Sequence, residues 1–268
     1  MIMAADARVG TFGYTGTAWG ARARDWALVQ EDQSLVLYDA ILARLPLKRG
    51  TRLLDVACGA GRFCQLASMT GAAVTGIDLS PSMIAVAHGR VPAGTFRVGP
   101  LQALPFPNER FAVVTAINAL QYCADPLSAL REARRVTQAG GTVVLAAWSD
   151  EGVCDVQLPL AAVDGLLPVD TQRAPGPLGL AADGSLETLA MRAGLTPTDA
   201  ADICCDWFYA DHETALRAFL SMGPSVYAMR YVGEAVVRAC VSDALSPFRT
   251  EAGTYVLRNT ARYVVTHA

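Results

Sequence analysis

The sequence lacks the features that mark membrane, secreted and nucleic-acid-binding proteins. No apolar run reaches the roughly 18 residues that a membrane span requires. The first residues lack a basic region followed by an apolar one, so we expect no signal peptide. Lys48 is the only lysine, and the net charge of −3 provides no basic surface for RNA or DNA. The composition therefore favours a cytoplasmic protein without nucleic acid or membrane partners.

The cysteines lack the spacing of a metal site. They form no Cys-x-x-Cys pair and are odd in number, so we expect no metal and no disulfide framework. Buried free thiols are the simpler interpretation, and they suit a reducing cytoplasm. The seven positions are Cys58, Cys64, Cys123, Cys154, Cys204, Cys205 and Cys240.

Strands and helices alternate over the middle of the chain. The pattern predicts strands at 51–57, 73–77, 95–98, 111–117 and 142–148, and helices at 62–69, 81–88 and 126–135. Ser80 is expected to cap the second of these helices, with Pro81 at its first position. This rhythm predicts a mostly parallel sheet with helices on both faces.

The flanking segments are less regular. We expect a mobile arm at 1–20, one or two helices at 21–45, an insertion at 150–184 and a helix stop at 222–224. Further helices are expected at 185–193, 213–222 and 233–245, with a strand inside 199–209 and a final strand at 255–266.

A glycine loop and a later acid point to an adenosine ligand. Asp55, Gly59 and Gly61 lie between a strand and a helix, where glycine permits a tight turn close to a ligand. Asp78 follows Gly59 at about the 20-residue spacing of an acid that binds ribose hydroxyls. The alternative is that Asp78 only caps the next helix. Because both features occur together, we favour the ligand.

The loop lacks the third glycine of a dinucleotide site. Cys64 occupies the position where that glycine would approach a pyrophosphate. A ligand without phosphates needs no such approach, so the loop points away from NAD and towards S-adenosylmethionine.

Residues 53–63 (LLDVACGAGRF) resemble the first motif of class I S-adenosylmethionine-dependent methyltransferases. Asp78 matches the acid that this family uses for the ribose. Residues 99–106 resemble its adenine-side loop, and 111–126 resemble its fourth-strand segment. The similarity covers about residues 50–150, and 185–194 match the helix and turn after the fifth strand.

The resemblance implies a fold, a cofactor and a set of residues. The implied fold is a Rossmann-like, mostly parallel α/β sheet of seven strands, the last antiparallel, with a helical lid. The implied cofactor is S-adenosylmethionine. The implied cofactor-binding residues are Asp55, Ala57, Gly59, Gly61, Asp78, Leu79, Met83, Leu101, Gln102 and Asn118. Two positions depart from the family: Pro100 stands where an aspartate is frequent, and Phe111-Ala112 stands where Phe-Asp is frequent.

The acceptor side of the site is less defined by sequence. His212 is the best candidate for a general base, because His88 lies at a helix end and His267 at the tail. Asn118 either presents its carbonyl to the cofactor or only ends a strand. Aromatic residues, including those at 207–209, either line an apolar pocket or pack in the core. The residues expected to contact the acceptor are Tyr14, Trp19, Trp26, Tyr122, Trp148 and Met222.

The sequence therefore predicts a methyltransferase built as one α/β core with a cap. With 268 residues, 52% hydrophobic, the chain is long enough for this. We expect an arm and cap helices at 1–48, the cofactor-binding core at 49–149, a lid at 150–184, and the rest of the core at 185–268 with a lid insertion near 211–250. The expected acceptor is small and fairly apolar, such as a secondary metabolite. A non-methylating enzyme, for example a cyclase, and a non-catalytic binding protein stay open, and an oligomer is compatible with the sequence.

Overall fold

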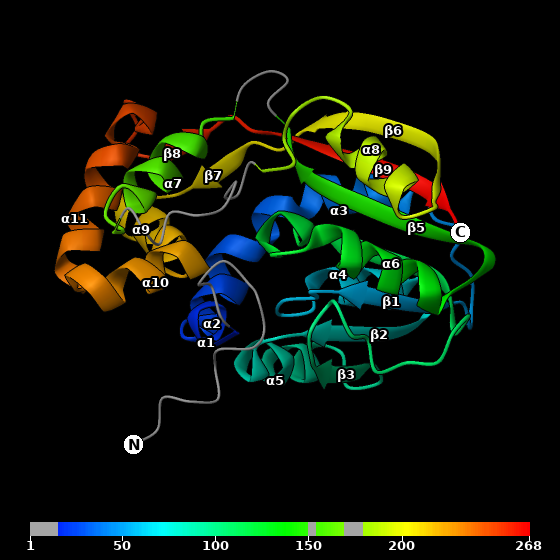
Figure 1. Cartoon of the computed structure of the whole chain (residues 1–268). Helices are drawn as coiled ribbons and strands as arrows, with labels where there is room; N and C mark the ends of the chain where they lie inside the picture. The colour runs from blue at the N-terminus through cyan, green and yellow to red at the C-terminus, as the bar shows by residue number, and fades with distance from the viewer. Residues whose placement is uncertain (1–15, 150–153, 169–178) are drawn as a thin grey trace.

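The computed structural model describes residues 16–149, 154–168 and 179–268. A seven-stranded sheet forms its centre (Figure 1). The strands are β1 (Arg52–Val56), β2 (Ala73–Asp78), β3 (Thr95–Val98), β4 (Phe111–Ile117), β5 (Thr137–Trp148), β6 (Thr196–Cys204) and β9 (Thr260–His267). Their order is β3-β2-β1-β4-β5-β9-β6, and β9 runs antiparallel to both neighbours. This arrangement confirms the predicted mostly parallel sheet with its last strand antiparallel.

Helices cover both faces of the sheet and bury two separate apolar cores. Neighbouring β1 residues divide between them, because successive side chains of a strand point to opposite faces: Leu53 joins one core and Leu54 the other. The first core is covered by α3 (Leu35–Leu42), α4 (Arg62–Met69) and α5 (Pro81–Arg90). The second is covered by α6 (Pro126–Val136) and α8 (Ser185–Arg192).

Local capping fixes where the helices beside the sheet begin. Ser80 Oγ accepts from the Met83 N–H (3.2 Å), and Pro81 opens α5 as the sequence predicts. The Asp125 carboxylate accepts from the Ser128 N–H (2.9 Å) at the start of α6. Helix α5 therefore begins directly after β2, and α6 begins after the loop that follows β4. Both connections lie at the edge of the sheet where the parallel strands end.

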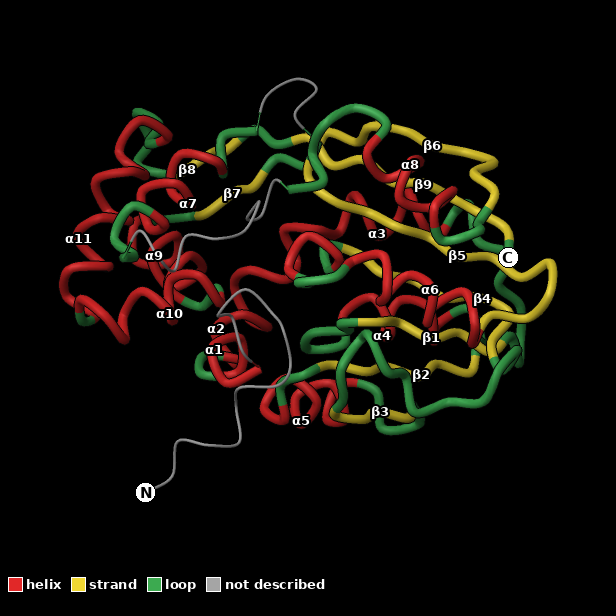
Figure 2. The backbone as a smooth tube through the Cα atoms, viewed as in Figure 1, coloured by secondary structure: helices red, strands yellow, loops and turns green. Residues whose placement is uncertain are grey.

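A helical cap stands beyond the carboxyl ends of the parallel strands (Figures 1 and 2). Its N-terminal part comprises α1 (Gly16–Gly20), α2 (Ala23–Asp25), a π-helical turn (Trp26–Gln30) and a 3-10 turn (Glu31–Ser34). Its later part comprises α7 (Gln157–Asp164), α9 (His212–Leu220), α10 (Gly223–Val232) and α11 (Glu234–Leu245). A two-stranded sheet of β7 (Trp207–Tyr209) and β8 (Tyr255–Leu257) joins this cap to the core. Short 3-10 turns occupy Leu120–Tyr122 and Ser246–Phe248.

Two predicted strands are each divided in two. Residues 199–209 contain the end of β6 and all of β7, and residues 255–266 contain β8 and most of β9. The buried Asn259 lies between β8 and β9. Its side chain accepts from the Val156 N–H (2.9 Å) and donates to the Leu257 carbonyl (3.2 Å). Its backbone carbonyl accepts from the Cys205 N–H (2.7 Å). These hydrogen bonds take the place of strand-to-strand hydrogen bonds. The segment after β6 and the segment before β9 therefore leave the large sheet at the same place.

Four further predictions of local structure need correction. Residues 16–20 form helix α1 rather than an arm, and 157–164 inside the expected insertion form α7. A helix does end just before the expected stop at 222–224, because α9 ends at Leu220, but Gly223 also begins α10, where Pro224 is well suited to the first helical turn. The fifth strand begins at Thr137, earlier than expected. Its Gly141 lies so close to the Ala112 carbonyl that an added Cβ would be 2.9 Å away.

No helix in the described part of the chain is long and apolar enough to cross a membrane.

Candidate active site

A pocket with about 1200 Å³ of space, counted to its open mouth, lies between the sheet and the cap. Its floor is formed by the carboxyl ends of β1, β2, β4 and β5, at Ala57, Asp78, Asn118 and Trp148. Its roof comes from the N-terminal cap, α7 and the loop before α10. In open parallel sheets ligands bind beyond this edge, so the position agrees with the general rule.

The glycine loop turns sharply between β1 and α4. Gly59 and Gly61 have φ of 53° and 82°, a left-handed conformation that glycine adopts without steric cost. Gly59 lines the pocket. Gly61 packs instead against α5, where an added Cβ would lie 2.8 Å from the Ala87 Cβ. Ala57 also has a positive φ, 58°, which costs about 1–2 kcal/mol for a residue with a side chain.

Asp78 lies on the pocket wall at the end of β2. One carboxylate oxygen accepts from the Gly59 N–H (3.0 Å) and the other from the Ser80 N–H (2.8 Å). Burial raises the pKa of Asp78, and these two backbone hydrogen bonds oppose the rise. The cap of α5 is supplied by Ser80 itself, so helix capping does not account for the position of Asp78.

Asp55 lies beneath the glycine loop and is 4% exposed. Its carboxylate accepts from Thr115 Oγ1 (2.7 Å) and from the Cys64 thiol (3.8 Å). Burial raises the pKa of Asp55 to about 7, with Thr115 opposing the rise and the Glu31 charge adding to it. The charge of this carboxyl is therefore sensitive to any cation placed in the pocket.

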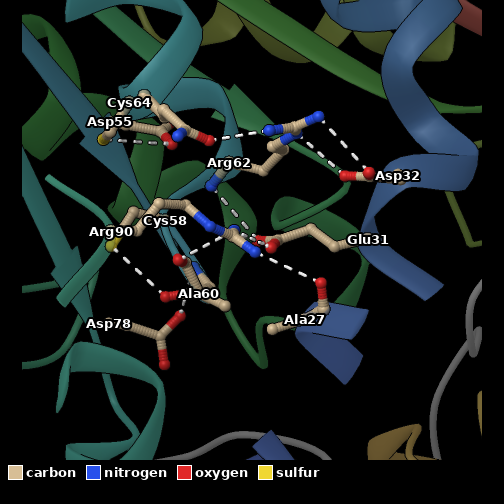
Figure 3. A network of polar contacts seen from close by, with 12 residues as sticks. Ala27, Glu31, Asp32, Asp55, Cys58, Ala60, Arg62, Cys64, Asp78 and Arg90 are labelled. Carbon is tan, nitrogen blue, oxygen red and sulfur yellow. Dashed lines mark hydrogen bonds and ion pairs between the residues drawn. The ribbon is translucent and has the colours of Figure 1, made fainter. Parts of the chain in front are cut away.

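A buried ion pair joins the cap to the glycine loop (Figure 3). Glu31 is 3% exposed and pairs with Arg90 of α5, and it also accepts from the Arg62 N–H (3.4 Å). Arg90 donates to the carbonyls of Ala60 (3.0 Å) and Ala27 (3.2 Å). Burial raises the pKa of Glu31 although Arg90 opposes it. The cap, the loop and α5 are thus held together at one point.

Aromatic rings form part of the pocket lining. Trp19 meets Trp26 and Tyr122 edge to face, with ring centroids 5.4 and 5.2 Å apart. Trp148 meets Trp207 in the same way at 5.3 Å. The Nε1 atoms of Trp26 and Trp207 are buried and have no hydrogen-bond partner among the described residues. The described part of the fold therefore leaves these two buried donors without a hydrogen bond.

The structure brings most of the sequence-predicted residues to this pocket. The lining includes Asp55, Ala57, Gly59, Asp78, Leu79, Met83, Leu101 and Asn118 of the cofactor set, and Trp19, Trp26, Tyr122, Trp148 and Met222 of the acceptor set. Gly61 and Gln102 lie outside it, and Tyr14 lies outside the described residues.

His212 is not brought to the pocket. It opens α9, with its Nδ1 2.9 Å from the Tyr255 hydroxyl and its Nε2 3.1 Å from the Ser242 hydroxyl. Both ring nitrogens are therefore engaged within the cap, and the pocket lining does not include this residue. A role for His212 as general base has no geometric support.

The sequence did not predict a set of polar residues that line the roof of the pocket. Gln30, Glu31, Ser34 and Tyr38 line the pocket, yet they lie in a segment whose apolar spacing predicted only helices. The π-helical turn and the 3-10 turn that follow it change which side chains face inward. No local signal singles out Glu31, because it lies within a run of five polar residues at 30–34.

A family model described as a methyltransferase domain matches residues 54–145, which extend from within β1 to within β5 and include the glycine loop. This part, about a third of the chain, is therefore a methyltransferase domain, in agreement with the S-adenosylmethionine-dependent methyltransferase that the sequence predicts. Its cofactor is S-adenosylmethionine, and the enzyme class predicted from the sequence is confirmed.

The sequence and the fold of this methyltransferase are similar to those of several known proteins, over part or most of their length. An uncharacterised protein of Mycobacterium bovis, Mb1440c, is 27% identical over 82% of this chain and 81% of its own length. A malonyl-[acyl-carrier protein] O-methyltransferase of Erwinia billingiae is 32% identical over 46% of this chain and 49% of its own length. The crystal structure of the [4+2]-cyclase SpnF has a TM-score of 0.58 at 22% identity, covering 86% of this chain and 80% of that one. The last similarity shows the shared fold alone.

The pocket of this methyltransferase suits its cofactor in two respects. Gly59 leaves space that a Cβ would fill, 3.3 Å from Glu31 Oε1 and 3.6 Å from Trp26 Nε1. The buried Trp26 Nε1 also lacks a partner among the described residues. A polar molecule that reaches the glycine loop would satisfy this donor.

Proposed function

We propose that this methyltransferase moves the methyl group of S-adenosylmethionine to a small, fairly apolar acceptor. The observation that carries the proposal is the continuity of one pocket, from Asp78 and Gly59 to the aromatic wall at Trp148. A cofactor bound over β1 and β2 would leave the space over β5 for the acceptor. A secondary metabolite as acceptor and a cytoplasmic location, without nucleic acid or membrane partners, belong to the same proposal.

We assign the cofactor half of the pocket as follows. Asp78 would accept from the ribose hydroxyls: two backbone N–H groups hold its carboxylate in place, and each oxygen keeps a further lone pair for a ligand. Leu79 and Met83 would pack near the ribose and adenine. The backbone of Leu101 would serve the adenine ring, with Gln102 behind it. Asp55, Ala57, Gly59 and the Asn118 carbonyl would surround the methionine part, and Gly61 shapes the loop.

We assign the acceptor half to Trp19, Trp26, Tyr122, Trp148 and Met222, with Tyr14 as a further candidate outside the described residues. The bound cofactor supplies an electrophilic methyl group on a positive sulfur. The chain would hold both reactants in one continuous pocket. Proximity and orientation then supply much of the rate, because a reaction between two molecules becomes one within a complex.

A turnover assay tests the proposal. Incubation with S-adenosylmethionine and a panel of small acceptors should give S-adenosylhomocysteine in step with a methylated product. Cofactor binding without product would favour a non-methylating reaction, such as a cyclisation, or a non-catalytic binding protein.

The variant Asp78→Ala tests the cofactor site itself. Losing a charged hydrogen-bond acceptor should weaken binding about 10- to 100-fold, equivalent to about 1.5–3 kcal/mol. Calorimetric titration with the cofactor measures this change. Asp39→Asn on the exposed side of α3 is the matched control and should leave the affinity unchanged. Equal affinities of the Asp78 variant and the wild type would make Asp78 purely structural.

A further inference from the structure

The indole ring of Trp19 lies where the two proposed halves of the pocket meet. It lines the pocket and meets Trp26 and Tyr122 edge to face. Trp26 lies close to the glycine loop, since its Nε1 would be 3.6 Å from a Cβ added to Gly59. Tyr122 lies in the turn that follows β4, the strand between β1 and β5. The position of the Trp19 ring therefore affects how much of the pocket is left for an acceptor.

The helix that carries Trp19 is packed closely against its neighbours. Helix α1 lies between α5 and α10 (Figure 1). Its glycines Gly16 and Gly20 are about one turn apart and face the segment after β2. A Cβ added to Gly16 would be 2.2 Å from the Leu79 carbonyl oxygen, and one added to Gly20 would be 2.1 Å from Ser80 Oγ. Because the backbone of α1 rests directly on this segment, crowding at the ring would move the side chain rather than the helix.

Two polar contacts also tie this part of the chain to α10 and α11. Arg230 of α10 donates to Thr17 Oγ1 (2.9 Å). Arg22 pairs with Glu234 at the start of α11 (2.6 Å). These contacts lie on either side of Trp19 in the sequence, so they limit how far its backbone can move from α10. A change on α10 beside the ring should therefore act on the ring itself.

Gly223, the first residue of α10, lies against the Trp19 ring. A Cβ added to Gly223 would be 2.6 Å from Cε2, 2.7 Å from Nε1 and 2.8 Å from Cδ2 of that ring. The φ angle of Gly223 is not positive, so its backbone does not itself require glycine. The preceding residue, Met222, lines the pocket. What the fold requires at position 223 is therefore the absence of a side chain next to the indole.

A side chain at position 223 would push the indole towards the pocket. Ordinary contacts between carbon atoms are about 3.5–4 Å, so the ring would have to withdraw by about 1 Å. The backbone of α1 is held as described above, and Trp26 and Tyr122 already pack against the ring. The pocket is the open space that Trp19 borders. An added methyl group would thus narrow the pocket beside Trp19.

We propose that Gly223 is a specificity-determining residue, because it lets Trp19 stand back against α10 and thereby sets the width of the acceptor half of the pocket. The inference rests on the proposed function and names what limits the size of the acceptor. Trp19 would contact the acceptor, and Gly223 is a positioning residue that acts through it. Neither residue is among those assigned to the cofactor, so this pair should alter acceptor binding without altering cofactor binding.

The binding of flat probes of increasing size tests this role. The probes are phenol, 2-naphthol and 9-phenanthrol, which carry one hydroxyl group on one, two and three fused rings. Calorimetry measures their dissociation constants with the enzyme saturated with S-adenosylhomocysteine. Gly223→Ala should weaken the binding of 9-phenanthrol relative to phenol about tenfold, the usual scale of overpacking by one methyl group. Trp19→Phe should strengthen it relative to phenol. The affinity for S-adenosylhomocysteine should change less than twofold in both variants.

The double variant Gly223→Ala with Trp19→Phe tests whether the glycine acts through the ring. The smaller ring leaves room for the added methyl group, so the ratio of the 9-phenanthrol and phenol affinities should return close to that of the wild type. Gly89→Ala is the matched control: Gly89 is also helical without a positive φ, but a Cβ there would meet nothing within 4 Å. It should leave the ratio unchanged. Loss of stability alone would lower the unfolding temperature and leave this ratio as it is.

The remaining outcomes separate this inference from the proposed function. The same ratio in the wild type and Gly223→Ala, or no recovery in the double variant, overturns the inference alone. If Gly223→Ala does not fold, an unchanged ratio in Trp19→Phe overturns it. Failure of both the wild type and Trp19→Phe to bind any probe also overturns it, because the space beside Trp19 then receives no flat apolar molecule. Absence of S-adenosylhomocysteine binding by the wild type overturns the proposed function, and the inference with it.

Discussion

The buried pair of Glu31 and Arg90 allows a sharp test of how the cap is held on the glycine loop. Their side chains are 3% and 16% exposed. Replacing Arg90 by Met keeps similar bulk but leaves the Glu31 carboxylate buried without its partner. Breaking a buried pair in this way costs about 3–5 kcal/mol of folding free energy. For a domain of this size the unfolding temperature should fall by about 5–10 °C.

The loss of folding free energy caused by Arg90→Met should depend on pH, and the pKa of Glu31 determines the direction of that dependence. Burial already raises the pKa of Glu31 above the unfolded value, and Arg90 opposes that rise. Removing Arg90 raises the folded pKa further, so the variant takes up a proton more readily when folded. Its stability is therefore highest below the unfolded pKa of Glu31 and is lost as pH rises through the folded pKa. The deficit relative to wild type should be larger at pH 8 than at pH 5.

Urea denaturation at both pH values measures this deficit. The double variant Glu31→Gln with Arg90→Met should recover part of the loss, because no buried charge is left unpaired. Arg238→Met is the matched control, since Arg238 pairs with Glu213 on the surface at 41% and 59% exposure. It should cost under about 1 kcal/mol. A pH-independent cost of Arg90→Met, or one no larger than this control, would refute the reasoning.

Two further perturbations test the pocket floor. S-adenosylmethionine should bind more tightly at pH 8 than at pH 6, because Asp55, with a pKa raised to about 7, is more fully ionised and faces a cationic ligand. Calorimetry should show a smaller pH dependence of affinity in two cases: when Asp55→Asn binds S-adenosylmethionine, and when the wild type binds S-adenosylhomocysteine, whose sulfur is uncharged. If both cases showed the same pH dependence as the wild type with S-adenosylmethionine, Asp55 would be ruled out as its source. Gly61→Ala should destabilise the fold more than Gly50→Ala does. Both residues have a positive φ, 82° and 81°, but only at Gly61 would a Cβ meet a neighbour, Ala87 at 2.8 Å. Equal losses in thermal unfolding would mean that backbone strain alone matters.

The core of this fold can be predicted from the amino-acid sequence because its signals are local. Each βα unit carries its own strand pattern, turn glycine and cap, as at Ser80 and Pro81. The glycine loop and Asp78 are likewise fixed by short spacings along the chain. The seven-stranded order follows once the family of the first motif is identified. Most residues that the proposal assigns to the cofactor half can therefore be named from the sequence alone, and the structure places most of them in the pocket lining.

The cap could not be predicted in the same way, because long-range contacts determine it. Asn259 lies between β8 and β9, and its side chain bonds to a residue far away in sequence, Val156. The roof residues Gln30 and Glu31 face inward because a π-helical turn shifts the helical period there. His212 opens a helix as expected, yet its direction depends on Tyr255 and Ser242, which the sequence does not place beside it.

The difference between local and long-range contacts also explains why the floor of this pocket is polar and its wall is aromatic. In the proposed assignment the floor would bind an unchanging cofactor, and it offers backbone groups and acids held by neighbours on adjacent strands, such as Asp55 and Thr115. The roof and the aromatic wall would contact the acceptor, and they come from segments separated by more than a hundred residues, such as Trp19 and Trp207. Because indole rings supply broad apolar contact with one directional N–H, a small change in their placement selects a different acceptor without disturbing the floor. Specificity in this enzyme should accordingly respond to substitutions in the cap, while cofactor affinity should respond to substitutions at the ends of β1 and β2.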